Sequence, residues 1–468
     1  MNPTMKQTIR TPAFSLLLLS VLSLALPTAR AADGTIAKFQ FGSGTVAPGY
    51  TQVLPDMEYT AERGFGFEKG SAVVSVDRSG SKAARLVAKI ASVFHREDPL
   101  QGHFVTSDKP FYFSARVPEE GNYRVTVTLG DRSGESTTTI KAELRRLMVE
   151  KIHTEPGKFA TVSFIVNTRT PKIPAVGEIA AGVVKLKAPR ESVQEGWAWD
   201  NLLTLEFNNA RPALCAVEIA KVDVPTVFII GDSTVCDQSR EPFNSWGQML
   251  PNFLKPDIAV ANHAESGETY RDSIGRRRLD KMLSLMKPGD YLLMQFGHND
   301  QKQIAAHSGG PFTTYKAEIK VHVDRVRAHG GIPVIISPME RRNYNPDGSF
   351  KPTLSDYAEA SRQAASELKV AFIDLNARSM VFYRALGMDK AYLAFAGTGL
   401  KRDATHHDNY GSYELAKIIV QGIRDDGLPL ASHIVDDFAG FDPSHPDPVE
   451  TFALPPSPLV TKLRPLGD

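Results

Sequence analysis

The amino-acid sequence predicts a protein of the β plus α/β class, in which an antiparallel β-sandwich precedes a three-layer α/β/α domain with a mostly parallel sheet. Apolar and polar residues alternate with a period of two before residue 222, whereas continuous apolar runs recur at helix-sized intervals after residue 224. The length of 468 residues also exceeds one ordinary domain of roughly 100 to 200 residues. We therefore predict domains over 33–222 and 224–435. A proline-rich tail over 436–468 is predicted to be an extended strap or partly disordered.

Residues 1–31 have the pattern of a cleaved export signal. A basic start is followed by an apolar stretch over 14–26, and small residues stand at Ala29 and Ala31. This stretch is well short of the ~20 residues that a membrane-spanning helix needs. We therefore expect cleavage near Ala31, and a protein that acts in the periplasm or outside the cell.

The segment 33–222 carries the strand pattern. From residue 123 to residue 129 every second residue is apolar, and 140–144, 162–166 and 203–207 repeat this alternation. Turn-forming clusters such as 119–122 separate these runs. Half-buried strands joined by such turns predict an antiparallel β-sandwich.

The segment 224–435 has the pattern of alternating strands and helices. Apolar runs typical of strands buried on both faces occupy 226–230, 258–261, 291–296, 332–337 and 370–375. Apolar residues at helical spacing lie between them, as in 315–326 and 355–368. This order predicts βαβ units and a parallel sheet covered on both faces, with reactive groups at the carboxyl ends of the strands.

The charge balance and the cysteine content limit the classes of partner and of metal site that are expected. Lys and Arg number 54 against 53 for Asp and Glu, so charge alone favours neither nucleic acid nor a membrane surface as a partner. A neutral or locally recognised substrate is expected. Cys215 and Cys236 lack the spacing of a zinc site, and the sequence leaves open whether they form a disulfide or remain buried thiols.

Ser233 is the candidate nucleophile. Gly231-Asp232-Ser233-Thr234 directly follows the first buried run, which places Ser233 at the carboxyl end of a strand. A helix cap is the alternative interpretation of these residue types. The Gly-x-Ser-x-Gly elbow of ordinary α/β-hydrolases does not occur in the sequence.

Two further motifs complete a hydrolytic set. Asn299, in Gly297-His298-Asn299-Asp300, ends the third buried run and can direct a side-chain N–H at a developing oxyanion, although Asn-Asp is also ordinary turn chemistry. Asp403 precedes His406 by three residues, so its carboxylate can hold imidazole Nδ1–H while Nε2 faces a serine. Three such motifs at strand ends of one sheet indicate a serine hydrolase.

With these motifs, the chain from about 224 to 425 resembles the GDSL/SGNH hydrolases, whose four blocks carry Ser, Gly, Asn and His. The matching positions are Ser233, Gly267, Asn299 and His406, and Asp403 matches the aspartate that accompanies the histidine. The resemblance implies a flavodoxin-like α/β/α fold and a triad of Ser233, His406 and Asp403. It also implies an oxyanion hole formed by the backbone N–H groups of Ser233 and Gly267 and the Asn299 side chain, without a cofactor or a catalytic metal.

Local features are most similar to rhamnogalacturonan acetylesterases with a galactose-binding-like sandwich ahead of the hydrolase. The stretches 231–235, 245–250 and 337–342 carry this resemblance, as do 39–42 and 64–67 in the N-terminal part. In one departure, Gly267 is followed by Glu268-Thr269, whereas in many single-domain members Arg-Ser follows this glycine. The resemblance implies removal of O-acetyl groups from a pectic polysaccharide through an acyl-enzyme.

Three residues are candidates for binding the substrate. Trp246 offers an aromatic wall to a sugar, although it also fits a core residue. Arg271 offers a charge-assisted bond to a galacturonate carboxylate, although it also fits an ordinary surface residue. His298 is the third candidate.

The sequence leaves other functions open. An esterase of the same mechanism could act on another acetylated glycan such as xylan or on a lipid ester, and a non-catalytic glycan-binding protein is the alternative of another class. The sandwich either binds carbohydrate or shapes one wall of the cleft. The oligomeric state, the acetylated position and the presence of a structural calcium ion are not determined.

Overall fold

The computed structural model describes Met1 and residues 34–78, 98–399 and 401–465. The predicted export signal lies, apart from Met1, outside the described residues. The described residues from 34 to 465 belong to one compact unit. In the described part of the chain, no helix combines the length and the apolar character needed to cross a membrane.

The N-terminal part forms the predicted sandwich of two sheets. One sheet has the order β10-β7-β14-β1-β2, with β4 and β5 joined through β14, and the other has the order β3-β6-β13-β8-β9. Strand pairs are antiparallel except that β1 also pairs with β2 in parallel. The strands of the first sheet are β1 (Gly34–Phe41), β2 (Thr51–Val53), β4 (Val74–Asp77), β5 (His103–Thr106), β7 (Gly121–Gly130), β10 (Phe159–Thr168) and β14 (Ala213–Lys221). Those of the second sheet are β3 (Phe65–Phe67), β6 (Phe111–Arg116), β8 (Ser136–Ala142), β9 (Arg146–Thr154) and β13 (Leu202–Asn208).

Alternating side chains from the two sheets fill the sandwich core. Val125, Val127 and Leu129 of β7 and Leu205 of β13 are fully buried, and all belong to one apolar cluster. The expected period-two runs therefore fall on β7, β8, β10 and β13. After β10, the chain forms a small two-stranded ribbon of β11 (Lys172–Ile173) and β12 (Gly182–Val183) before it returns to the sandwich at β13.

The C-terminal part has a five-stranded parallel sheet in the order β16-β15-β17-β18-β19. Its strands are β15 (Thr226–Gly231), β16 (Ala259–Asn262), β17 (Tyr291–Gln295), β18 (Ile332–Ile336) and β19 (Ala371–Ile373). Because the first strand lies between the second and the third, the strand order reverses beside β15. In open sheets of this kind, the loops at such a reversal form the binding crevice.

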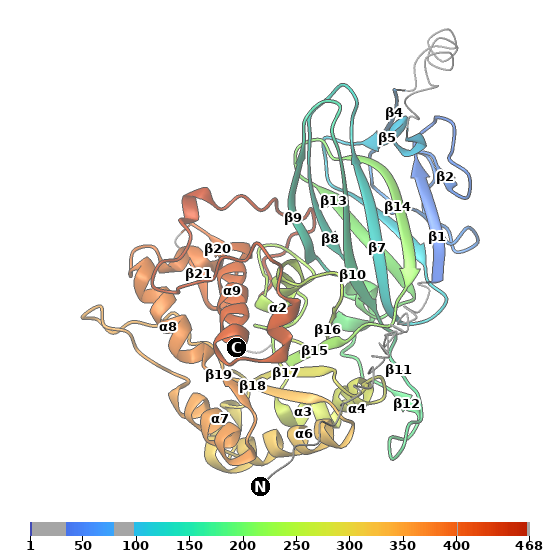
Figure 1. Ribbon diagram of the computed structural model, residues 1–468. Coiled ribbons are helices and arrows are strands. Elements are labelled where there is room, and N and C mark those ends of the chain that lie inside the picture. Colours follow the sequence, from blue (N-terminus) through green and yellow to red (C-terminus); the bar gives the residue numbers. More distant parts are fainter. Residues whose placement is uncertain (2–33, 79–97, 400, 466–468) are drawn as a thin grey trace. The chain divides into compact units, whose positions relative to one another are not determined.

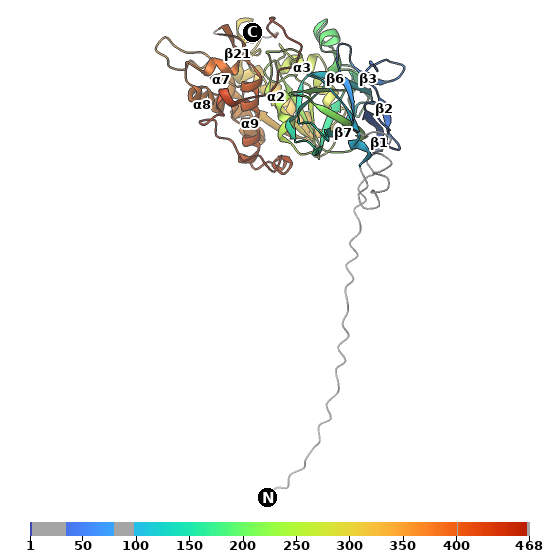
Figure 2. The same ribbon diagram turned by 90° about the horizontal axis from the view of Figure 1, so that it is seen from above.

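Helices cover both faces of this sheet (Figure 1). Val227 and Ile229 of β15 pack in a cluster with residues of α2, α8 and α9, whereas Phe228 and Ile230 pack with residues of α3, α4, α6 and α7. On the first face, α8 and α9 lie side by side (Figure 2). The helices are α2 (Trp246–Met249), α3 (Tyr270–Gly275), α4 (Arg278–Leu283), α5 (Lys302–Ala305), α6 (Lys316–Ala328), α7 (Ser355–Leu368), α8 (Leu375–Leu386) and α9 (Asn409–Asp425). The three-layer prediction is confirmed.

Shorter elements complete the chain. A hairpin of β20 (Phe395–Thr398) and β21 (Lys401–His407) precedes α9, so the segment 403–407 lies on a strand of this separate hairpin rather than at a strand end of the parallel sheet. The described part of the tail, 436–465, is irregular, with turns at 436–437 and 443–444 and one helical turn. The short helical turns are η1 (Pro99–Gln101), η2 (Arg190–Gln194), η3 (Gly196–Ala198), η4 (Leu250–Phe253), η5 (Pro311–Tyr315), η6 (Ala391–Ala394), η7 (Pro429–His433) and η8 (Val449–Thr451).

Buried ion pairs join the sandwich to the loop that follows β15. Arg145, between β8 and β9, forms an ion pair with Glu241 (2.6 Å), and its Nη1 donates to the Phe243 carbonyl oxygen (2.8 Å). The neighbouring Arg146 pairs with Asp237 (3.2 Å). All these charged side chains are almost completely buried, so the contacts fix the position of the loop just after Ser233.

Candidate active site

The loop after β15 holds Ser233 in a tight turn. At Gly231, an added Cβ would lie 2.5 Å from the Gln295 carbonyl oxygen, so a side chain there would clash with β17. Asp232 Oδ1 accepts hydrogen bonds from the Thr234 backbone N–H (3.0 Å) and hydroxyl (2.7 Å), and Oδ2 lies 3.2 Å from His298 Nδ1. Burial alone would raise the pKa of Asp232, but the His298 charge and these hydrogen bonds outweigh it and lower the pKa.

Ser233, His406 and Asp403 lie within hydrogen-bond distance of one another in series. His406 Nε2 is 2.9 Å from Ser233 Oγ, and His406 Nδ1 is 3.0 Å from Asp403 Oδ2. The Phe243 ring contacts the imidazole edge at a centroid distance of 5.9 Å. All three polar side chains are buried. This is the geometry in which a histidine can take a serine proton while a carboxylate orients the imidazole.

Asp403 is held by more donors than the sequence indicated. The backbone N–H groups of Thr405 (2.8 Å) and His406 (3.1 Å) donate to Oδ1. Arg464 donates from Nε to Oδ2 (2.6 Å) and from Nη2 to Oδ1 (2.8 Å). Burial opposes ionisation, but the bonds from His406 and Arg464 outweigh it and hold the pKa of Asp403 far below its usual range. Sequence reasoning missed Arg464, since no local pattern relates the tail to position 403.

The structure separates the two adjacent histidines into different environments. His406 faces Ser233, whereas His407 Nε2 contacts the Tyr383 hydroxyl (2.8 Å) and its ring packs on Phe395. Burial and the nearby His406 charge lower the pKa of His407 to about 3. His407 is therefore a neutral core residue at ordinary pH.

Two of the predicted oxyanion donors, Gly267 and Asn299, line the same cavity. Gly267 has φ +74°, a conformation that favours glycine. Asn299 Nδ2 donates to the Glu268 carbonyl oxygen (3.1 Å), and Lys302 Nζ donates to Asn299 Oδ1 (3.2 Å), which orients the amide. The loop that carries Gly267 is thus in contact with the end of β17.

Two residues that sequence reasoning missed support this loop. Gln238 Nε2 donates to the Ser233 carbonyl oxygen (2.7 Å) and to Ser266 Oγ (3.4 Å). Lys187, which follows β12, donates to the Ser266 carbonyl oxygen and pairs with Glu268 (2.8 Å). Part of the chain before residue 222 therefore supports the loop of the predicted oxyanion hole.

Two cavities are lined in part by residues of this site and in part by cationic side chains. One of about 460 Å³ is lined by residues that include Lys187, Gly267, Arg271, Asn299 and Lys302. Another, of about 420 Å³, is lined by residues that include Arg190, Gln238, Arg240, Phe243 and Arg464. Of the three candidate binding residues, Arg271 lines the first cavity with its side chain 45% exposed and paired with Glu318 (2.8 Å).

The other two candidates for substrate binding are buried. Trp246 has no exposed surface, and its Nε1 donates to Gln295 Oε1 (2.9 Å) within the core under α2. It therefore offers no face to a sugar, and the expectation of an aromatic wall at this position is wrong. His298 is also buried, and its Nδ1 lies 3.2 Å from Asp232 Oδ2. It lines neither of the two cavities described above.

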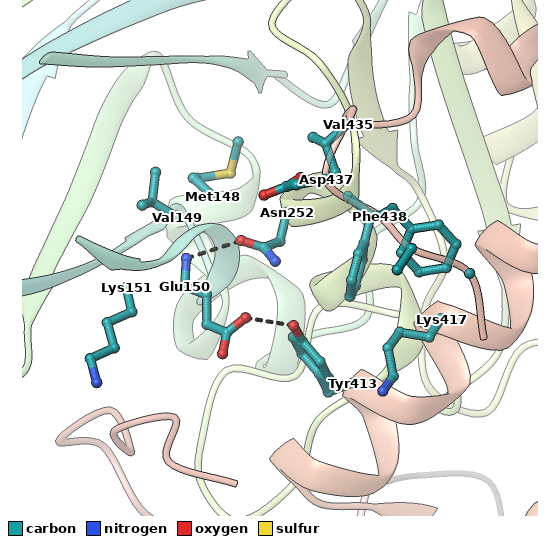
Figure 3. Close-up of a pocket in the computed structure, with 13 residues that line it drawn as sticks. Met148, Val149, Glu150, Lys151, Asn252, Tyr413, Lys417, Val435, Asp437 and Phe438 are labelled. Carbon is teal, nitrogen blue, oxygen red and sulfur yellow. Dashed lines mark hydrogen bonds between the residues drawn. The ribbon is translucent and has the colours of Figure 1, made fainter. Parts of the chain in front are cut away.

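A separate cavity of about 590 Å³ lies between β9, η4, α9 and the chain after η7 (Figure 3). Figure 3 shows Glu150 and Tyr413 pointing towards one another, and the Tyr413 hydroxyl donates to Glu150 Oε2 (2.5 Å). Asn252 Oδ1 accepts from the Glu150 N–H (3.0 Å). The lining contains neither Ser233 nor its hydrogen-bonded partners, so the size of this cavity does not make it the reaction site.

The thiols and potential metal ligands lie apart from one another. Cys215 and Cys236 are both buried free cysteines. Cys215 contacts the Gly130 carbonyl oxygen in the sandwich (3.3 Å), whereas Cys236 lies beside Ser266 (3.4 Å). Among residues 34–78, 98–399 and 401–465, no group of three or more His, Cys, Asp or Glu side chains is placed to hold a metal ion.

Comparison with known proteins identifies two family matches. Residues 229–406 match the GDSL-like lipase/acylhydrolase family, and residues 37–149 match the β-agarase/YXIM esterase-like, galactose-binding domain-like family. Both matches fall within the sheet systems described above.

Two of the relatives are proteins of Bacillus subtilis. The rhamnogalacturonan acetylesterase RhgT is 34% identical over 221 residues, which cover 45% of this chain and 94% of that protein. The uncharacterized esterase YxiM is 27% identical over 412 residues, which cover 85% of this chain and 93% of that protein. The crystal structure of YxiM matches with 23% identity and a TM-score of 0.42, covering 84% of this chain and 99% of that chain.

Proposed function

The chain belongs to the GDSL-like lipase/acylhydrolase family and hydrolyses ester bonds, and we propose that it removes O-acetyl groups from rhamnogalacturonan, a pectic polysaccharide. The observation that carries the proposal is the pair of hydrogen bonds from Ser233 through His406 to Asp403. The likeness to RhgT, named a rhamnogalacturonan acetylesterase, supports the choice of an acetylated glycan.

In the first half of the proposed reaction, the acetyl group passes to Ser233. Ser233 Oγ attacks the acetyl carbonyl carbon while His406 Nε2 accepts the hydroxyl proton. The C=O electrons move to the oxygen, which becomes the oxyanion of a tetrahedral intermediate. When the C–O bond to the sugar breaks, His406 returns its proton to the departing sugar oxygen, leaving acetyl-Ser233 and a free sugar hydroxyl.

In the second half, water releases the acetyl group. His406 takes a proton from a water molecule whose oxygen attacks the acetyl carbon, and a second tetrahedral intermediate forms. Its collapse breaks the bond to Ser233 Oγ, which recovers its proton from His406, and acetate leaves. The complete reaction consumes one water molecule per ester bond and needs no cofactor.

Donors fixed before the reaction stabilise both intermediates. In the proposal, the oxyanion accepts hydrogen bonds from the backbone N–H groups of Ser233 and Gly267 and from Asn299 Nδ2. The contacts that Glu268 and Lys302 make with the Asn299 amide support this role, because they restrict its orientation. Preset donors stabilise charge that appears only in the intermediates, without reorganising during the reaction.

The cavity beside Gly267 supports a substrate that carries carboxylates. Lys187, Arg271 and Lys302 all line it. Their charges are shared with protein groups, since Lys187 pairs with Glu268 and Arg271 with Glu318. A galacturonate carboxylate next to Arg271 gains a charge-assisted bond there. We also propose, from the pattern over 1–31, that the enzyme acts after export, where a polymeric glycan is accessible.

The test is acetate release from acetylated rhamnogalacturonan, acetylated xylan and a small aryl acetate by wild type and Ser233→Ala. Ser349→Ala, in an exposed turn, is the matched control. We expect wild type to release acetate mainly from the pectic polymer. Ser233→Ala should release none, and the control should release acetate at the same rate as wild type. Release mainly from xylan or the aryl ester would reassign the substrate, and equal rates for wild type and Ser233→Ala would overturn the catalytic role of Ser233.

A further inference from the structure

The segment 454–465, which we call the strap, is fastened to the sandwich at its beginning. Lys141 Nζ on β8 donates to the Pro455 carbonyl oxygen (2.8 Å). On β13, Asn208 Nδ2 donates to the Pro456 carbonyl oxygen (3.0 Å), and Glu206 Oε2 accepts from Ser457 Oγ (2.7 Å). These buried polar contacts fix the path of the strap over the second sheet of the sandwich.

The strap then runs beside the loop that follows Ser233. Glu241 receives a hydrogen bond from the Ser457 backbone N–H at its carboxylate (2.9 Å). Its own N–H donates to the Leu459 carbonyl oxygen (2.8 Å), and its carbonyl oxygen accepts from the Thr461 N–H (2.7 Å). The same Glu241 carboxylate pairs with Arg145 (2.6 Å). The strap is therefore tied to both sheet systems through one buried residue.

Three residues beyond Thr461, the strap brings Arg464 to Asp403. Both carboxylate oxygens accept from the guanidinium, at 2.6 Å from Nε and 2.8 Å from Nη2. The Asp403 side chain is 3% exposed, whereas that of Arg464 is 53% exposed. This bidentate arrangement fixes the plane of a carboxylate as well as its position.

We propose that Arg464 is a positioning residue of the active site, which orients Asp403 and is delivered to it by the strap. Asp403 Oδ2 accepts from both Arg464 Nε and His406 Nδ1, so the guanidinium fixes the oxygen that orients the imidazole. Arg464 does not contact the reacting serine in this arrangement and acts through Asp403. The inference rests on the proposed function, in which His406 is the base.

The Arg464 charge also sets how strongly Asp403 favours a protonated imidazole. A cation on the carboxylate offsets part of its negative charge, so removal of that cation makes protonation of His406 easier. Arg342 faces Asp403 from the loop after β18 and donates to its carbonyl oxygen (3.4 Å). On β21 itself, Arg402 is paired with Asp408 (2.7 Å), and His407 is neutral at ordinary pH.

The experiment compares two substitutions that separate charge from geometry. Arg464→Met removes the charge but keeps a long, unbranched side chain. Arg464→Lys keeps the charge but loses the bidentate hydrogen-bond geometry. Lys462→Ala is the matched control, because Lys462 is an exposed cation of the strap for which the described residues show no ion pair. Each protein is assayed for kcat and KM on an aryl acetate from pH 4 to pH 9, with Ser233→Ala as background.

For Arg464→Met we expect kcat to fall about fivefold with little change in KM, because exposure to solvent limits the strength of such a pair. We also expect the acid limb of the kcat/KM profile to move about half a unit to higher pH. Arg464→Lys should recover the position of the acid limb and only part of kcat. Lys462→Ala should match wild type.

Several outcomes would overturn the inference. If Arg464→Met and Lys462→Ala have the same rate and the same pH profile, Arg464 does not act on Asp403. A loss of rate with an unmoved acid limb, shared by both Arg464 variants and by Lys462→Ala, would mean that the strap only supports the fold. Failure of wild type to show any turnover above Ser233→Ala would instead overturn the proposed function, whatever residue stands at position 464.

Discussion

His406 Nε2 lies 2.9 Å from Ser233 Oγ, although 173 residues separate the two in the sequence. Ser233 follows the first strand of the parallel sheet, whereas His406 belongs to the hairpin before α9. Their hydrogen bond exists only because the hairpin folds back over the carboxyl end of β15.

Asp403→Asn should lower kcat by roughly 10³- to 10⁴-fold. The neutral amide lacks the negative charge with which Asp403 orients His406 Nδ1–H and stabilises the imidazolium. Turnover of an aryl acetate measures this. The chain offers a close control in the tail, where His445 Nδ1 lies 3.0 Å from Asp442 Oδ2 with the same sequence spacing. Both residues of that pair are exposed, so His445→Ala should leave kcat unchanged. Similar losses in the two variants would contradict the assignment.

Asn299→Ala should lower kcat by about 10²- to 10³-fold and change KM little, because an oxyanion donor contributes mainly in the transition state. Steady-state kinetics on the aryl acetate separate the two parameters. Asn201→Ala, an exposed position in the sandwich part of the chain, is the control. A raised KM with an unchanged kcat would indicate ground-state binding instead.

The free energy of unfolding should fall as the pH drops from 7 to 4, in part because of His407. In the folded protein its pKa is lowered to about 3 from an ordinary value of 6.5. Between these values the unfolded chain binds more protons at this site, so stability rises with pH across the window and is lost as the pH falls.

His407→Phe tests this contribution by urea unfolding at pH 7 and pH 4. The variant should be less stable at pH 7, by about 1 to 3 kcal/mol, because the Tyr383 hydroxyl loses its partner. Its stability should nevertheless fall less than that of wild type between the two pH values. His445→Ala is the exposed control, and an undiminished fall in His407→Phe would refute the prediction.

Glu241→Gln should lower the free energy of unfolding by about 3 to 5 kcal/mol, because it leaves Arg145 buried without its anionic partner. Chemical denaturation measures this loss. Glu450→Gln, which removes the exposed pair with Lys390, should leave the free energy of unfolding nearly unchanged, because solvent screens such a pair. Equal losses in the two variants would mean that the Arg145 pair does not stabilise the junction.

The sequence determined the two fold classes and the residues that approach Ser233, because both depend on local pattern. Alternating and continuous apolar runs reflect strands buried on one face or on two, which fixed the sandwich and the parallel sheet. Once parallel strands are assigned, their carboxyl ends meet at one edge, so Ser233 and Asn299 are expected to be neighbours. The three-residue spacing of Asp403 and His406 likewise acts within one segment.

The tertiary structure decided what depends on contacts between distant segments. Trp246 is of a residue type that often stacks against sugars, yet it is completely buried in the core at the start of α2. Spacing alone does not distinguish Asp403 and His406 from Asp442 and His445, and only the fold brings one of these pairs to Ser233. The bond of Arg464 to Asp403 requires the strap to run from the sandwich, past the loop after β15, to the hairpin that carries Asp403, and local periodicity carries no information about such a path.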